Sequence, residues 1–309
     1  MSAWRPDSTA KWWALALAYY VAGCLMHLQF SLWLVRQRLT VLGRLAYSDA
    51  MPWLVLAGGC GLALWLAIRI PRSAHPRMAA AYWLLWLAAI GLIDRYLTYS
   101  INECMHYPQY AGLAWLLARA LDPQRSGRAF GRVLFWTTLL GAGDELLQYL
   151  WITSSYSDYM DFNDVLTNLV AAAAGTMLYY SAGRREPDAG PTRRPVVEAA
   201  TAVVLVLVIG TGLLAGRLVP TPVVKVPPGG IVRADDGWRL YMQRGPDFYG
   251  GWQPSKRHVR YHVMAPVPGL LVVLAAGLLF AGVGAGAAGR TAFSRATSRS
   301  PSSAWVPPA

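Results

Sequence analysis

Residues 197–218 read VEAATAVVLVLVIGTGLLAGRL, an apolar run of 22 residues with one carboxylate near its start and one arginine near its end. The hydrocarbon core of a bilayer takes about 20 such residues as a helix, because lipid offers no partners to backbone polar groups. This run therefore predicts a helix that spans a membrane.

Seven other segments of the chain have the same character. Of the 309 residues, 55% are hydrophobic and only 14% are charged, which is unlike an ordinary soluble domain. We therefore predict an all-α polytopic membrane protein with eight spans, the first of them a retained anchor. The predicted spans are residues 12–35, 51–69, 78–94, 101–121, 130–152, 162–182, 197–218 and 264–284.

The basic residues predict the orientation of these spans. The chain has 28 Lys and Arg against 16 Asp and Glu, a net charge of +12. With both termini in the cytoplasm, the segments on that side hold 16 basic residues and the short loops on the other side hold 4, the bias of the positive-inside rule. We predict a multi-pass inner (plasma) membrane protein with cytoplasmic termini, and no nucleic-acid partner.

The longest predicted outer loop, residues 219–263, has Pro and Gly punctuation between short runs such as WRLYM and HVRYHV. This pattern predicts a small extracytoplasmic cap that contains strands. The Ser-, Pro- and Arg-rich residues 290–309 predict a disordered basic cytoplasmic tail. The predicted organisation is two N-terminal helices in 1–77, a four-helix core in 78–183, a cytoplasmic linker and the seventh helix in 184–218, the cap in 219–263, the eighth helix in 264–289 and the tail.

Polar residues gather at three predicted helix ends. Residues 134–182 contain no Lys or Arg but five carboxylates. An ionisable group at the bilayer centre costs about 2.5–3.5 kcal/mol, so such groups usually face a bundle interior or a wet cavity. In the predicted orientation, the outer leaflet holds the start of the fourth helix, the end of the fifth and the start of the sixth. We therefore expect the polar faces of these three helices to converge there. The residues concerned are Glu103, His106 and Tyr110, then Asp144, Glu145 and Gln148, then Asp161, Asp164 and Asn168, with the small residues Ala172 and Gly175 continuing the last face.

Three motifs in this region are ECMHYPQY at 103–110, DELLQ at 144–148 and DVLTN at 164–168, followed by Gly175. In this order they resemble the VanZ-like family of bacterial membrane proteins, over about residues 78–183. The resemblance implies envelope or antibiotic-response biology, since the eponymous member is associated with low-level teicoplanin resistance, but no settled reaction. The chain departs from the family where it has Ala171 in place of a glycine and no arginine in 149–163. The role of that arginine would be lost, or would pass to Arg95 or to the arginines of the cap.

An imidazole with a carboxylate one helical turn away is suited to general acid/base catalysis. Whether the chain is an enzyme stays open, because the same cluster could pack the helices together or bind a ligand without chemistry. The residues predicted to be catalytic are Glu103, His106, Asp144 and Glu145. The residues predicted to bind substrate are Tyr110, Gln148, Asp161, Asp164 and Asn168.

A metal held by His106 with Glu103, Asp144 and Asp164 is a further alternative. One histidine is a weak basis for zinc. We therefore predict no metal site, and the sequence names no cofactor.

The predicted function is recognition of an envelope amphiphile at the outer leaflet, with or without its modification. A lipid-linked precursor or a lipoglycopeptide antibiotic would be such a ligand, and membrane lipids are the other expected partners. An intramembrane hydrolase or transferase that acts on a lipid is one alternative, and a proton-coupled transporter is another. The oligomeric state is not predicted.

The loop charges lead to a labelling prediction. In a background without the three native cysteines, a cysteine at Ser155 should react with an impermeant thiol reagent in intact cells, whereas one at Pro191 should react only after permeabilisation. The reverse pattern would overturn the predicted orientation.

Overall fold

The computed structural model describes residues 6–36, 47–73, 75–155, 157–181 and 195–288. The fold is mostly helical, and each helix lies within a few residues of a predicted span, apart from an N-terminal extension of the first. The predicted tail and all of residues 184–194, which include Pro191, lie outside the described residues. The helices are α1 (Pro6–Arg36), α2 (Tyr47–Arg69), α3 (Pro76–Tyr96), α4 (His106–Leu121), α5 (Phe130–Leu147), α6 (Phe162–Ser181), α7 (Val196–Leu214) and α8 (Pro266–Ala287).

Two helix ends differ from the predicted boundaries. Residues Ile101–Met105 form a 3-10 turn, so α4 begins at His106. The turn is stabilised by a capping box, in which the Glu103 carboxylate accepts the Ser100 N–H at 2.9 Å and the Ser100 side chain faces Glu103 in return. After α5 the chain continues as a π-helical turn, Gln148–Ile152. Both differences lie at the helix ends where the predicted polar faces meet.

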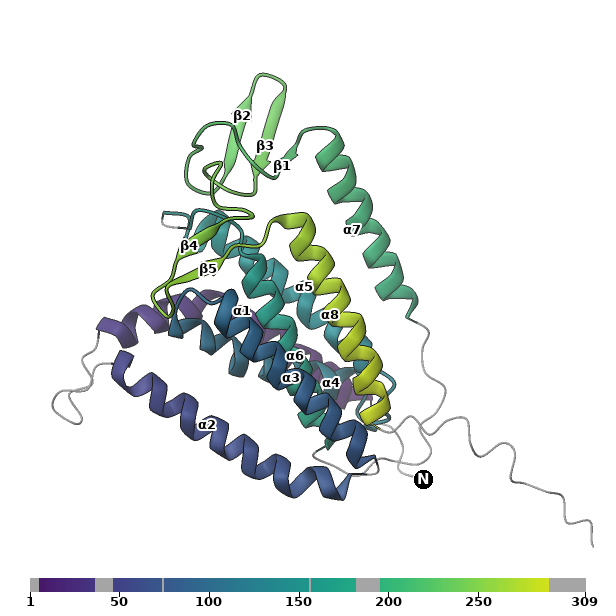
Figure 1. The fold of residues 1–309 in the computed structure, drawn as a ribbon. Coiled ribbons are helices and arrows are strands. Elements are labelled where there is room, and N and C mark those ends of the chain that lie inside the picture. Colours follow the sequence, from purple (N-terminus) through teal and green to yellow (C-terminus); the bar gives the residue numbers. More distant parts are fainter. Residues whose placement is uncertain (1–5, 37–46, 74, 156, 182–194, 289–309) are drawn as a thin grey trace, which may run out of the picture.

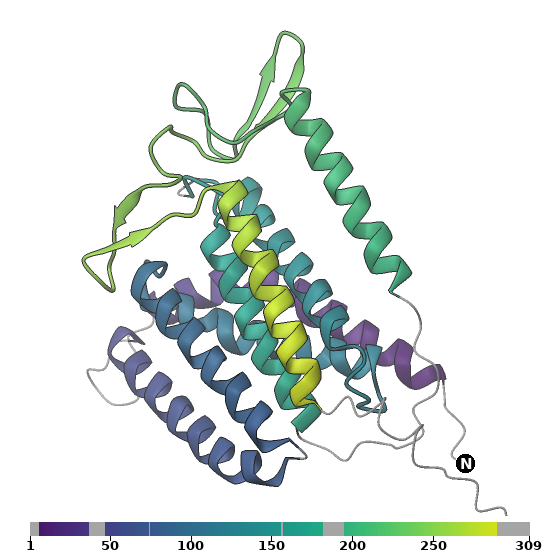
Figure 2. The ribbon, with the colours of Figure 1, turned by 45° about the vertical axis from the view of Figure 1, so that its right-hand side comes forward.

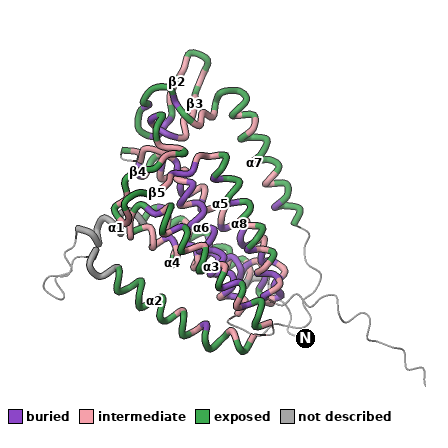
Figure 3. Tube along the Cα trace, in the orientation of Figure 1, coloured by how far each residue is buried: buried purple, intermediate pink, exposed green. Residues whose placement is uncertain are grey.

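α6 lies at the centre of the bundle. It packs against α4, α5, α8 and α3, and α1 lies against α4. Nearly all side chains of α6 are buried, whereas most of those described on α2 and α7 are exposed and apolar (Figure 3). α7 stands apart from the bundle in both ribbon views (Figures 1 and 2), and Glu198 ties it to Arg132 of α5.

Among the described residues, four helical segments are long and apolar enough to cross a membrane: Pro52–Arg72, Pro76–Tyr96, Val196–Leu214 and Pro266–Ala287. The chain is therefore a membrane protein by the length and composition of its helices. α4 has only 16 residues, and α5 and α6 carry the polar groups described below. These interior helices turn their polar groups toward one another.

The predicted cap consists of two small sheets. β1 (Leu218–Val219) pairs in parallel with β3 (Gly237–Tyr241), which pairs antiparallel with β2 (Ile231–Ala234). β4 (Trp252–Pro254) and β5 (Arg260–His262) form a separate antiparallel pair. The cap covers the end of the bundle where α5 ends and α6 begins (Figure 1).

The backbones of α4 and α6 touch at Gly175, as the small residues below Asn168 predict. A Cβ atom at Gly175 would lie 2.1 Å from the carbonyl oxygen of Ala111. No side-chain rotation relieves such a clash, because the neighbour is backbone. Gly175 thus fixes the separation of the two helices that carry His106 and Asn168.

Replacing this glycine should force the two helices apart. We expect Gly175→Ala to destabilise the protein by about 1–3 kcal/mol or more, as overpacking does. Gly91→Ala in α3 is the matched control, because a Cβ there meets no atom within 4 Å. Thermal unfolding in detergent measures both, and equal unfolding temperatures would contradict the close contact.

Candidate functional site

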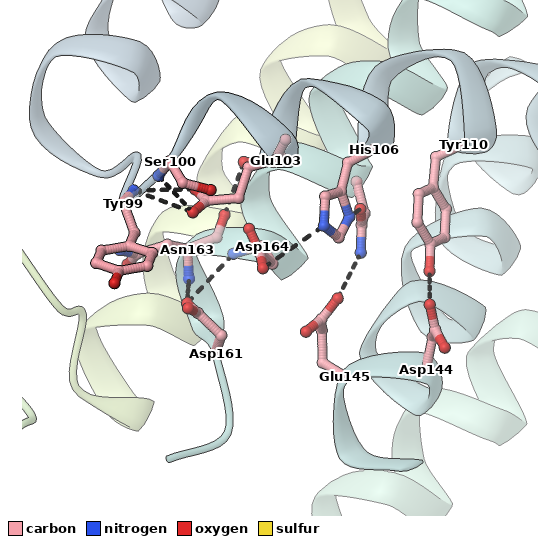
Figure 4. Close-up of polar contacts among 12 residues, drawn as sticks. Tyr99, Ser100, Glu103, His106, Tyr110, Asp144, Glu145, Asp161, Asn163 and Asp164 are labelled. Carbon is pink, nitrogen blue, oxygen red and sulfur yellow. Dashed lines mark hydrogen bonds and ion pairs between the residues drawn. The ribbon is translucent and has the colours of Figure 1, made fainter. Parts of the chain in front are cut away.

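Three helix ends meet in one polar cluster beneath the cap (Figure 4). The start of α4, the end of α5 and the start of α6 supply its side chains, which confirms the predicted convergence. We use the name polar cluster for the six side chains that contact one another there. They are His106, Tyr110, Asp144, Glu145, Asp164 and Asn168.

Asn168 connects the histidine to a carboxylate. Its Oδ1 lies 2.8 Å from Nδ1 of His106, and its Nδ2 donates to Oε1 of Glu145 at 3.4 Å. Because a carboxylate only accepts hydrogen bonds, the amide nitrogen must face Glu145 and the amide oxygen must face His106. Nδ1 of His106 is then the donor in that contact, so a neutral His106 carries its free electron pair on Nε2. All three side chains are buried.

Nε2 of His106 faces a second carboxylate. It lies 3.6 Å from Oδ2 of Asp164, at the start of α6. The other oxygen of Asp164, Oδ1, is buried and has no hydrogen-bond partner. His106 therefore stands between an amide on one side and an incompletely satisfied carboxylate on the other.

A second pair joins α4 to α5. The Tyr110 hydroxyl donates to Oδ2 of Asp144 at 2.7 Å, and both side chains are at most 1% exposed. Gly141 makes room for them, since a Cβ there would lie 3.2 Å from the Tyr110 ring and 3.0 Å from Cβ of Asn168. The tyrosine thus satisfies one oxygen of a fully buried carboxylate.

Three of the predicted site residues lie beside the cluster rather than in it. Glu103 belongs to the 3-10 turn that leads into α4 at His106, and its carboxylate accepts the Tyr99 and Ser100 N–H groups. Gln148 begins the π-helical turn, and no hydrogen bond joins its side chain to the polar cluster among the described residues.

Asp161 precedes α6 and caps its first turn. Its Oδ1 accepts the N–H of Asn163 at 2.8 Å and that of Asp164 at 3.4 Å. Desolvation, followed by repulsion from the Asp164 carboxylate, raises the pKa of Asp161 to about 7. Asp161 therefore takes up a proton at a higher pH than an exposed aspartate does.

The carboxylates of this region have no Lys or Arg partner in the described parts of the chain. Within the described parts of the chain, no Lys or Arg forms an ion pair with Glu103, Asp144, Glu145, Asp161 or Asp164. The cap arginines bind other carboxylates: Arg244 contacts Asp158 at 3.4 Å, and Arg257 contacts Asp94. Arg95 lies over the Tyr96 ring instead. The cap thus brings positive charge to the rim, while the cluster itself stays uncompensated.

Asn163 is a structural residue that the sequence patterns missed. It is 2% exposed, and its Nδ2 donates to the carbonyl oxygens of Leu97 and His262, at 2.9 and 2.7 Å. Its Oδ1 accepts the Met264 N–H at 3.1 Å. One side chain therefore ties the start of α6 to the loop before α4 and to the cap. In the sequence, the sign of this role is an amide side chain within the polar run DFND, just before an apolar span.

In comparisons with known proteins, no family model, no curated protein and no solved structure matches this chain. The fold and the site define the class by themselves. The protein is a helical membrane protein whose interior helices bury a polar cluster under a small cap of strands.

The Tyr110–Asp144 pair allows a stability prediction. Tyr110→Phe should cost about 1–3 kcal/mol, because it leaves a fully buried carboxylate without its donor. Tyr82→Phe is the matched control: its hydroxyl is equally buried but donates to the Ala173 carbonyl, at 2.8 Å, so its loss should cost about 1 kcal/mol. Thermal unfolding in detergent compares them, and a larger effect at Tyr82 would contradict this assignment.

Proposed function

We propose that this protein is an eight-span inner membrane protein that binds an envelope amphiphile at the outer leaflet through the polar cluster. In this proposal both termini are cytoplasmic and the cap is extracytoplasmic. A lipid-linked precursor or a lipoglycopeptide antibiotic is the ligand class, as the VanZ-like resemblance implies. The observation that carries the proposal is a set of carboxylates, where three helix ends meet, that pair with no Lys or Arg of the described residues.

α4 and α5 reach the length of a membrane span only together with the helical turns at their ends. With the 3-10 turn, residues 101–121 are helical over 21 positions, and with the π-helical turn residues 130–152 are helical over 23. Both lengths match the roughly 20 residues that a bilayer core needs. Because their polar groups face one another, these helices fit the interior of a bundle whose exposed helices contact lipid.

The chemistry of the surroundings favours an amphiphile. The exposed side chains of the outer helices α2 and α7 are mostly apolar, so these helices fit contact with the tails of an amphiphile. Arg244 and Arg257 of the cap are paired with Asp158 and Asp94, so the negative cluster favours a headgroup that offers cationic or hydrogen-bond-donating groups.

Modification of the ligand is the enzymatic alternative. Nδ1 of His106 is held by Asn168, and Nε2 faces the Asp164 carboxylate. An imidazole oriented in this way is suited to take a proton from an attacking hydroxyl or water. This arrangement favours an intramembrane hydrolase or transferase as the second candidate function.

The proposal predicts which lipids accompany the purified protein. Mass spectrometry should find a specific amphiphile in extracts of the purified wild type. His106→Asn should retain about tenfold less of it, because the loss of one hydrogen bond of about 1.4 kcal/mol weakens binding about tenfold. Asp236→Asn, on the exposed cap hairpin, is the control and should retain it fully.

The same comparison separates binding from chemistry. A new lipid species in extracts of cells with the active wild type, and not with His106→Asn, would identify the reaction. Identical lipids in identical amounts with all three proteins would contradict both binding and modification at this cluster.

A further inference from the structure

We propose that the polar cluster binds a divalent metal ion through Nε2 of His106 and the carboxylates of Glu145 and Asp164. This inference deepens the proposed function, on which its role in ligand binding rests, but the ion itself can be tested without any lipid. It also differs from the metal set considered from the sequence, which grouped His106 with Glu103, Asp144 and Asp164.

The positions of the three side chains fit one ion. A nitrogen of His106 and one oxygen each from Glu145 and Asp164 all lie within 4.8 Å of one another. Ligands bonded at about 2.0–2.2 Å in a tetrahedral arrangement are separated by roughly 3.4 Å. The distance of 3.6 Å from Nε2 of His106 to Oδ2 of Asp164 already approaches that value.

Asn168 is placed to orient two of the ligands. Its Oδ1 contacts Nδ1 of His106, and its Nδ2 donates to Glu145. A metal-ligating histidine usually donates its other ring N–H to a fixed acceptor, which sets the tautomer and turns the free nitrogen toward the ion. The Asn168 amide therefore fixes the tautomer and orientation of His106, as the hydrogen-bond partners of ligating histidines do in known metal sites.

The cluster contains acceptor atoms that face each other and that a bound cation would stabilise. Nε2 of a neutral His106 and the Asp164 carboxylate are both acceptors, and two acceptors that face each other repel unless a cation lies between them. Oδ1 of Asp164 is buried without a partner, as is Oδ1 of the fully buried Asp144. No Lys or Arg of the described ranges pairs with either aspartate.

The other carboxylates lie outside the group of three ligand atoms that are within 4.8 Å of one another. Glu103 accepts backbone N–H groups of its own turn, and Asp144 accepts the Tyr110 hydroxyl. One imidazole with two carboxylates suits Mn²⁺ or Zn²⁺. Three protein ligands leave at least one position open, which a water or an anionic headgroup oxygen would take.

The test measures metal binding to the full-length protein, purified in detergent and stripped with a chelator. In titration calorimetry with Zn²⁺ and with Mn²⁺, we expect one ion per chain for at least one of the two metals. Glu145→Gln should weaken the binding of that metal at least about 100-fold, and Asn168→Ala about 10–100-fold, as loss of an orienting partner does.

Glu103→Gln is the matched control, because it removes the same charge from the same end of the bundle without removing a proposed ligand. Its affinity should stay within a few-fold of the wild type. Weaker binding in Glu103→Gln than in Glu145→Gln would overturn the ligand assignment. Absence of a stoichiometric site for both metals in the folded wild type would overturn the metal itself, and would leave the lipid proposal standing.

Discussion

Buried carboxylates constrain this fold more than any other feature. Asp144 and Glu145 are buried on α5 and Asp164 is mostly buried on α6, and none of the three pairs with a Lys or Arg among the described residues. Such groups cannot face lipid without a cost of several kcal/mol, so the helices that carry them must face each other. His106 and Asn168 meet these carboxylates from α4 and α6, and the outer helices present apolar surfaces around them.

Packing holds these helix ends in place. The missing side chain at Gly175 lets the α4 and α6 backbones touch, and Gly141 leaves space for Tyr110 beside Asn168. At the covered end, Asn163 ties α6 to the cap. The cluster is therefore built on rigid elements, which is the arrangement that precise binding of a ligand requires.

The sequence predicted the helices and their meeting point well, because apolar runs mark spans and the connectivity puts alternate helix ends on one side. It did not predict that Ser100 and Glu103 close a capping box before α4, since the helical spacing of Glu103 and His106 does not reveal it. The contact between Arg257 and Asp94 and the role of Asn163 could not be predicted. They depend on how the cap folds back over the bundle, which local patterns do not encode.

If the cluster keeps uncompensated charge for a ligand, that charge lowers the stability of the ligand-free protein. The most direct measurement is the unfolding temperature of the protein freed of metal and bound lipid, for the wild type and for Asp164→Asn. The substitution removes repulsion from a carboxylate whose Oδ1 has no partner, and an amide could donate to Nε2 of His106. An equal or higher unfolding temperature for Asp164→Asn is the predicted result. A clear fall would contradict the claim and make the carboxylate part of the packing.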